Sequence, residues 1–76
     1  MHYTITEMND LAGSQRLLLN KKGNQYEVGL YNRSTSTYKY RIFDTQEEAE
    51  AKFLCLASCI IRGIYNYEDR VKILED

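Results

Sequence analysis

The chain of 76 residues alternates apolar and polar positions up to residue 43 and then changes to a helical period. Three segments show the two-residue alternation of half-buried strands, at residues 15–21, 25–31 and 37–43. Lys-Gly-Asn at residues 22–24 predicts a turn, because Gly and Asn tolerate positive φ. The polar residues 32–36 predict the second connection. This spacing indicates a three-stranded antiparallel meander.

The residues before the meander are less regular. Residues 2–6 alternate only weakly and are compatible with a short strand. Residues 7–13 predict either a turn of helix or a loop. Gly13 and Ser14 then interrupt regular structure before the next strand.

A long helix is expected over residues 46–62. Thr45 can cap it by accepting a hydrogen bond from the backbone N–H of Glu48, and the Glu48 side chain can reach back to the backbone N–H of Thr45 to close a capping box. Gly63 can end it in the left-handed conformation. Apolar residues with a 3.6-residue period define its core stripe: Ala49, Phe53, Leu56, Ala57, Ile60 and Ile64.

The last segment has two interpretations. Asn66 can cap a second, shorter helix, in which Asp69 follows three residues on. Val71 and Ile73 also fit a short strand, so residues 67–74 are expected to be helix or strand.

These elements predict one small domain, residues 1–76, of the α+β class. Its expected architecture is a three-stranded antiparallel β-meander packed on one long α-helix, with a short C-terminal helix or strand. One face of the meander should pack on the helix stripe: Leu17, Leu19, Tyr26, Val28, Leu30, Tyr38, Tyr40 and Ile42.

The long helix has a second, partly apolar face. Leu54 and Ile61, with Cys55 and Ser58, lie off the core stripe. Either the C-terminal segment covers this face, or another protein or a second copy of the chain binds it. A disulfide between Cys55 and Cys59 would distort the helix, so free thiols are expected. An intermolecular disulfide or a reactive thiol is the alternative.

Charge is unevenly distributed although the net charge is only −1. Glu27 is the only acid in residues 14–43, whereas residues 44–76 carry eight acidic side chains and four basic ones. We therefore expect a basic sheet and an acidic helical layer. The outer sheet face is expected to present Tyr31 among basic side chains, a combination that binds nucleic acid or an acidic protein surface. The basic residues are Arg16, Arg33, Lys39 and Arg41.

The join between the last strand and the long helix resembles one found in a DNA-binding family. Residues 38–49 read YKYRIFDTQEEA and contain the pattern Phe-x-Thr-x-x-Glu-Ala. This run is similar to the arm-type DNA-binding domains at the start of phage and transposon integrases, which have three strands and a helix. The resemblance implies a sheet that enters the major groove.

The residue content argues against catalysis and against a membrane span. The only histidine is His2, near a terminus, and no Ser–His–Asp or Cys–His set can be built without it. We therefore expect no enzyme and no metal or other cofactor. No apolar run approaches the roughly 18 residues of a membrane span, and residues 1–4 lack a signal-peptide pattern. A cytoplasmic location without membrane contact is expected.

Two functions remain from the sequence. The first is a small non-enzymatic protein-binding module or inhibitor of phage or mobile-element type, which acts by covering a partner's surface and for which a homodimer is an option. It would use Leu54, Ile61, Cys55 and Ser58. The alternative is a small nucleic-acid-binding domain that uses the basic, tyrosine-containing sheet face.

Overall fold

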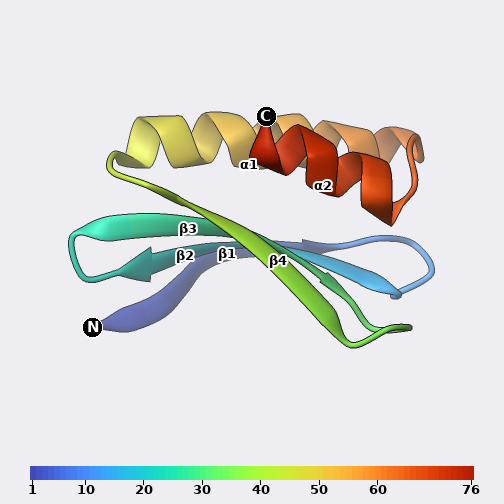
Figure 1. Cartoon of the computed structure of the whole chain (residues 1–76), viewed down its shortest axis with the longest axis horizontal. Helices are drawn as coiled ribbons and strands as arrows, with labels where there is room; N and C mark the ends of the chain where they lie inside the picture. Colours follow the sequence, from blue (N-terminus) through green and yellow to red (C-terminus); the bar gives the residue numbers. More distant parts are fainter.

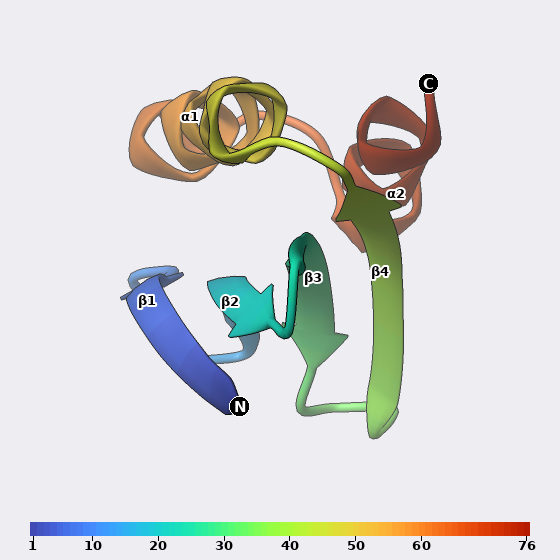
Figure 2. The same ribbon diagram turned by 90° about the vertical axis from the view of Figure 1, so that its left-hand side faces the viewer.

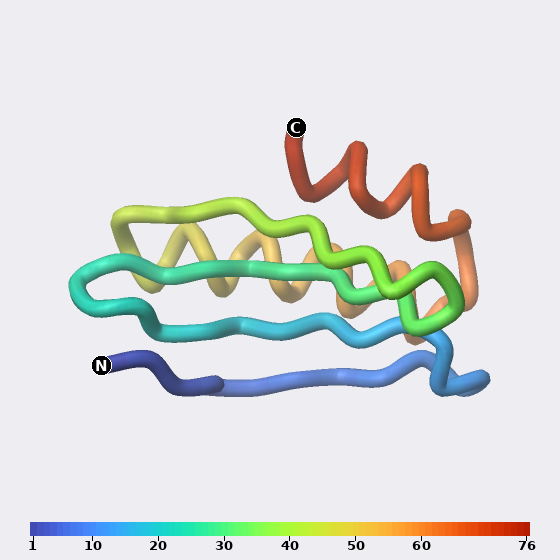
Figure 3. Tube along the Cα trace, turned by 60° about the horizontal axis from the view of Figure 1, so that its bottom comes forward, coloured from blue at the N-terminus to red at the C-terminus, as the bar shows by residue number.

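The computed structural model describes all residues, 1–76, and has four strands followed by two helices. The strands pair antiparallel in chain order, β1-β2-β3-β4, and both helices lie on one face of the sheet while the other face is bare (Figures 1, 2 and 3). The elements are β1 (His2–Asn9), β2 (Gln15–Lys22), β3 (Gln25–Asn32), β4 (Thr37–Phe43), α1 (Gln46–Arg62) and α2 (Tyr67–Glu75).

The α+β class and the antiparallel sheet are confirmed, but the predicted number of strands is wrong. The sheet has a fourth strand, β1, which extends through residues predicted as a turn of helix or a loop. Almost every β1 side chain is exposed, so burial imposes little alternation on its sequence. A register shift between Thr4 and Thr6 also interrupts the period of the strand.

The core lies between the central strands and the helices. Leu17 and Leu19 of β2 face Leu30 and Val28 of β3, and all four are fully buried. The helices close this core with buried residues of the predicted stripe and of α2: Ala49, Phe53, Leu56, Ala57, Ile60, Tyr67 and Leu74.

The predicted ends of α1 are confirmed. The Thr45 hydroxyl accepts a hydrogen bond from the Glu48 N–H at 3.3 Å and donates one to the Glu48 carboxylate at 2.9 Å. The return bond to Glu48 therefore comes from the Thr45 hydroxyl and not, as predicted, from its backbone N–H. Gly63 ends the helix with φ 65°, a conformation that glycine adopts without a Cβ clash.

The structure decides that the last segment is a helix. Asn66 caps α2 by accepting a hydrogen bond from the Asp69 N–H at 2.8 Å. The helix buries Tyr67, Arg70 and Leu74, so its period is that of an amphipathic helix rather than a strand.

The prediction of which face of β4 is buried is wrong. Arg41 lies opposite Val28, and Lys39 lies opposite Leu30, so these two cations share the helix-covered face of the sheet. Phe43 is the buried residue of β4 on that face. The residues expected in the core are exposed on the opposite face: Tyr38, Tyr40 and Ile42. The inner face of β4 accepts cations because it lies at the sheet margin beneath α2, where long side chains can reach backbone carbonyls.

Candidate protein-binding surface

The two layers separate at the edge of the molecule formed by β1 and α1. Helix α1 packs mainly on β2 and β3, and α2 packs on β3 and β4. Figure 2 shows α1 above the β1–β2 side of the sheet and α2 above the β4 side, and the side chains of β1 remain largely exposed. Two clefts open between β1 and α1, one beside the middle of the strand and one at its C-terminal end. Four exposed, large aliphatic residues among those that line them define what we call the β1–α1 edge: Ile5, Leu11, Leu54 and Ile61.

The aliphatic side chains of this edge are open to solvent. Leu54 is 66% exposed, Ile61 is 72% exposed and Leu11 is fully exposed. Because α2 packs on the opposite flank of α1, the prediction that the C-terminal segment covers this helix face is wrong. Contiguous exposed apolar side chains of this kind mark interaction surfaces more often than scattered ones do.

The structure brings the predicted helix residues together. Leu54, Ser58 and Ile61 follow the i, i+4, i+7 spacing of one helix face, and Cys55 lies exposed beside them. Cys55 and Cys59 are both free thiols, and Cys59 is buried. Ser58, which is small and exposed, lies between the two larger side chains.

Sequence reasoning missed the contribution of β1 to this surface. Ile5 occupies the irregular position of the strand, and Leu11 lies in the loop that follows it. The only signal for either residue was an apolar side chain outside a regular pattern. Their position beside α1 follows from the sheet order, which places β1 next to β2.

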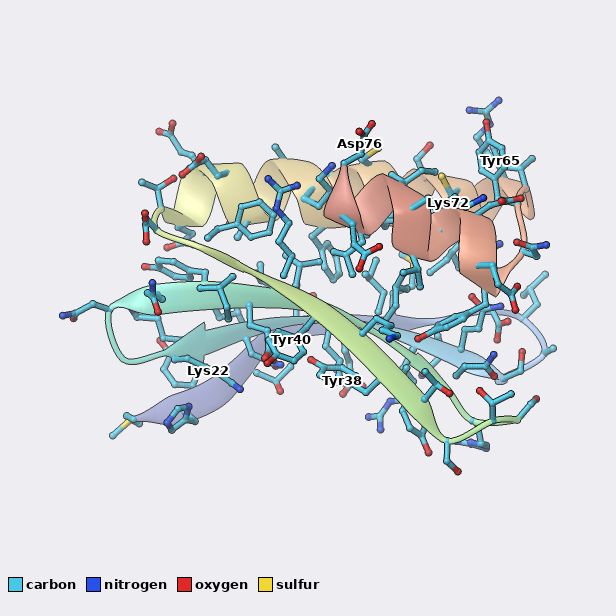
Figure 4. The ribbon with its side chains drawn as sticks, viewed as in Figure 1. Lys22, Tyr38, Tyr40, Tyr65, Lys72 and Asp76 are labelled. Atoms are coloured by element: carbon cyan, nitrogen blue, oxygen red, sulfur yellow. The ribbon has the colours of Figure 1, made fainter.

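The open face of the sheet carries a tyrosine pair. The rings of Tyr38 and Tyr40 stack with centroids 5.8 Å apart and an interplanar angle of 24°. The Lys22 ammonium lies 5.8 Å from the centre of the Tyr40 ring, and Figure 4 shows the three side chains gathered below the sheet. An aromatic pair with a cation on an uncovered sheet can stack on planar groups.

A buried carboxylate lies beneath this pair. Glu27 is only 2% exposed. Its carboxylate accepts hydrogen bonds from the Tyr38 hydroxyl and the Asn20 amide, both at 2.8 Å, and its Oε2 lies 2.9 Å from the Lys22 ammonium. Burial alone would raise the pKa of Glu27, but the bonds from Asn20, Lys22 and Tyr38 outweigh it and hold that pKa below its usual value. Burial and the Glu27 charge raise the pKa of Tyr38.

Gly29 makes this arrangement possible. A Cβ at Gly29 would lie 2.0 Å from the Tyr38 hydroxyl oxygen, so the tyrosine ring occupies the space of the missing side chain. A glycine inside a strand often indicates that another group approaches the backbone closely, and at Gly29 that group is the Tyr38 ring. Nothing in the sequence indicated that Glu27 would be buried.

The structure does not assemble the predicted basic sheet site. Arg16 and Tyr31 are opposite one another on the open face, where Arg16 also forms an ion pair with Glu7. Arg33 lies in the turn between β3 and β4. Lys39 and Arg41 lie on the helix-covered face, as described above, so the five residues predicted to act together are divided between two faces.

Two cations instead bind the end of α2. Arg41 donates hydrogen bonds to the carbonyl oxygens of Leu74 and Asp76, at 3.3 and 2.7 Å. Lys52 of α1 donates to those of Ile73 and Asp76, at 2.8 and 3.1 Å. Carbonyls at a helix C-terminus lack intrahelical partners, and the helix dipole favours cations there. These bonds give Arg41 a structural role.

Comparison with known proteins finds no family, no curated protein and no solved structure that matches the chain. None of its helices combines the length and the apolar character needed to span a membrane. No group of three or more histidine, cysteine, aspartate or glutamate side chains is placed to hold a metal ion.

Proposed function

We propose that the protein is a small non-enzymatic protein-binding module, or inhibitor, that acts by covering a surface of its partner. The β1–α1 edge is the binding surface. The observation that carries the proposal is the position of Ile5, Leu11, Leu54 and Ile61, which two separate segments of the chain bring to one side of the molecule without covering them. A cytoplasmic location belongs to the same proposal and rests on the sequence alone.

The exposed area sets the expected strength of binding. Together the four side chains expose the equivalent of about three whole aliphatic groups, and burying them contributes roughly 4–8 kcal/mol. A partner that buries a similar apolar area doubles this gain. Association costs about 4–15 kcal/mol in lost motion, which is of the same order as this gain, so we expect a weak complex.

Aspartate substitutions test the proposal. A tagged chain is purified with its complex from the cells that make it, and the size of that complex is measured for the wild type and for Leu54→Asp with Ile61→Asp. The expected result is loss of the complex with unchanged helix content by circular dichroism, because both residues are exposed. Tyr40→Asp, on the open sheet face, is the matched control and should keep the complex. Retention of the complex by the edge variant would refute the proposal.

The stacked tyrosines favour a second candidate, binding of nucleic acid to the open sheet face. Tyr40 offers an exposed ring for a base, and Lys22 offers a charge for a phosphate. Fluorescence anisotropy with single-stranded and duplex oligonucleotides, at low and near-physiological salt, tests it. The candidate requires salt-dependent binding that Tyr40→Ala abolishes and that Lys39→Ala, on the other face, leaves unchanged. The ion pairs of Lys22 and Arg16 with Glu27 and Glu7 reduce the positive charge of this face, so it ranks second.

A further inference from the structure

We infer that the partner of the β1–α1 edge is a second copy of this chain, with the two α1 helices antiparallel across a two-fold axis near Ser58. The inference rests on the proposed function, because it names the partner of the same surface. It is carried by the self-complementary order of side chains along the edge, by the charges at the two ends of α1 and by the size of the face.

The order of side chains along α1 reads the same from both ends. Leu54 and Ile61 are seven residues apart, which is about 10 Å along a helix, and Ser58 lies between them. A two-fold axis there places Leu54 of each copy against Ile61 of the other. The small Ser58 at the axis lets the helices approach to the 8–10 Å that is typical of packed helices.

The clefts of the edge fit the same symmetry. One cleft lies beside Leu54 and is lined by Ile5 and Phe53, and the other lies beside Ile61 and is lined by Met8 and Leu11. The axis places the first cleft of one copy against the second cleft of the other. Each copy therefore offers an aliphatic side chain and an apolar recess at matching positions.

The charges favour the antiparallel arrangement over a parallel one. Glu47 and Glu50 are exposed near the N-terminus of α1, and Arg62 is exposed in its last turn. Antiparallel packing brings the acidic end of each helix toward the basic end of the other. It also places the positive end of each helix dipole beside the negative end of the other, which is favourable. Parallel packing would place carboxylates beside carboxylates.

The size of the edge is sufficient for a small specific interface. The 17 residues of α1 extend over about 25 Å, and the shorter dimensions of the molecule are 21 and 17 Å. A face of these dimensions offers roughly 400–500 Å² per copy, or up to about 1,000 Å² in total, which is about the lower limit for a specific interface. Only 16 of 76 residues are buried in the single chain, so covering this edge extends a small core.

The proposed contact also limits the assembly to two copies. The register shift between Thr4 and Thr6 interrupts the free edge of β1, which opposes continuous strand addition. A two-fold contact uses the same patch on both copies and leaves no free patch for a third. The expected product is a discrete dimer.

Sedimentation equilibrium of the purified wild-type chain, over about 10–500 µM, tests the inference. The expected mass rises with concentration from 9.0 kDa toward twice that value. Leu54→Asp with Ile61→Asp should remain at the monomer mass throughout. A monomeric wild type, or a dimer that the double variant retains, would overturn the inference.

Disulfide cross-linking provides a second test. Its expected result is a new covalent product, so a variant that fails to fold cannot produce it by mistake. Ser58→Cys in a Cys55→Ser background places one thiol of each copy at the axis, where oxidised glutathione should convert most of the chain to a disulfide-linked dimer. Lys72→Cys in the same Cys55→Ser background, exposed on α2 (Figure 4), is the matched control and should remain largely monomeric. Equal cross-linking of the two variants would overturn the inference.

The two proposals fail in different ways. If the wild type is monomeric but its cellular complex is lost in the Leu54→Asp, Ile61→Asp variant, the inference fails and the protein-binding function stands with a different partner. If the cellular complex survives in that variant, the protein-binding function of the edge fails as well.

Discussion

Replacing Gly29 with alanine should destabilise the protein only while Tyr38 is present. The added Cβ would lie 2.0 Å from the Tyr38 hydroxyl oxygen and 2.3 Å from the ring carbon that bears it, so the ring must move away. The displacement breaks the 2.8 Å hydrogen bond from Tyr38 to the buried carboxylate of Glu27. The substitution therefore tests which face β4 turns toward the core.

The magnitude follows from two opposing effects. A hydrogen bond to a charged group is worth about 1.5–3 kcal/mol. Alanine in a strand gains about 0.5–1 kcal/mol over glycine. Gly29→Ala should therefore lower the free energy of unfolding by about 1–2 kcal/mol in the wild type. In a Tyr38→Ala background, where nothing occupies the space, the same change should raise it by about 0.5–1 kcal/mol.

Urea denaturation of the four proteins of this double-mutant cycle measures the effect. The expected coupling energy between the two positions is about 1.5–3 kcal/mol, and Gly29→Ala changes sign between the backgrounds. Equal costs of Gly29→Ala in both backgrounds would show that the Tyr38 ring does not cover Gly29. The assignment of Tyr38 to the open face would then be refuted.

The remaining predictions concern the edge, the buried acid and the end of α2. Leu54→Ala should change stability by about 0.5 kcal/mol or less, whereas Leu56→Ala, in the core, should cost about 2–5 kcal/mol in urea denaturation; similar costs would place Leu54 in the core. Because the folded pKa of Glu27 is below its ordinary value of 4.5, its stabilisation is present above that pH and is lost as the pH falls through the folded pKa. Glu27→Gln should therefore show a shallower loss of stability in acid than the wild type, and parallel curves would argue against an ionised Glu27. Arg41→Ala should lower the free energy of unfolding by about 1–2 kcal/mol and speed amide hydrogen exchange in the last turn of α2. An unchanged exchange rate would show that Arg41 does not cap this helix.

Much of the fold could be predicted from local chemistry. The cap at Thr45, the end at Gly63 and the core stripe of α1 depend on neighbouring residues, and the structure agrees with them except at Ile64, which follows the helix and is only half-buried. Strand β1 could not be predicted in the same way, because an exposed edge strand needs no alternation. Its place in the sheet depends on pairing with β2, which the local sequence does not encode.

The faces of β4 show a different limit. Both faces of this strand carry side chains with large apolar parts, since Lys39 and Arg41 have long aliphatic stems and Tyr38 and Tyr40 have rings. The two-residue period separates the faces but does not say which one is buried. That depends on α2, whose C-terminal carbonyls receive Arg41.

The candidate surface was partly visible in the sequence. Leu54 and Ile61 were indicated by a second apolar stripe on the long helix, which is a local property. Ile5 and Leu11 join them only through the sheet order and the uncovered position of β1. The sequence therefore indicated only the part of the surface that lies on α1, and the part that comes from β1 and the loop after it depends on the tertiary structure.

The most direct test of the protein-binding edge is photo-cross-linking in the cells that make the protein. A photoreactive amino acid replaces Leu54 in one variant and Tyr40 in another, so that one probe lies on the β1–α1 edge and the other on the open sheet face. If the β1–α1 edge is the binding surface, position 54 gives a discrete protein adduct and position 40 gives none. If the partner is a second copy, the adduct has twice the 9.0 kDa mass of the chain. An adduct from position 40 with none from position 54 would show that the β1–α1 edge is not the binding surface.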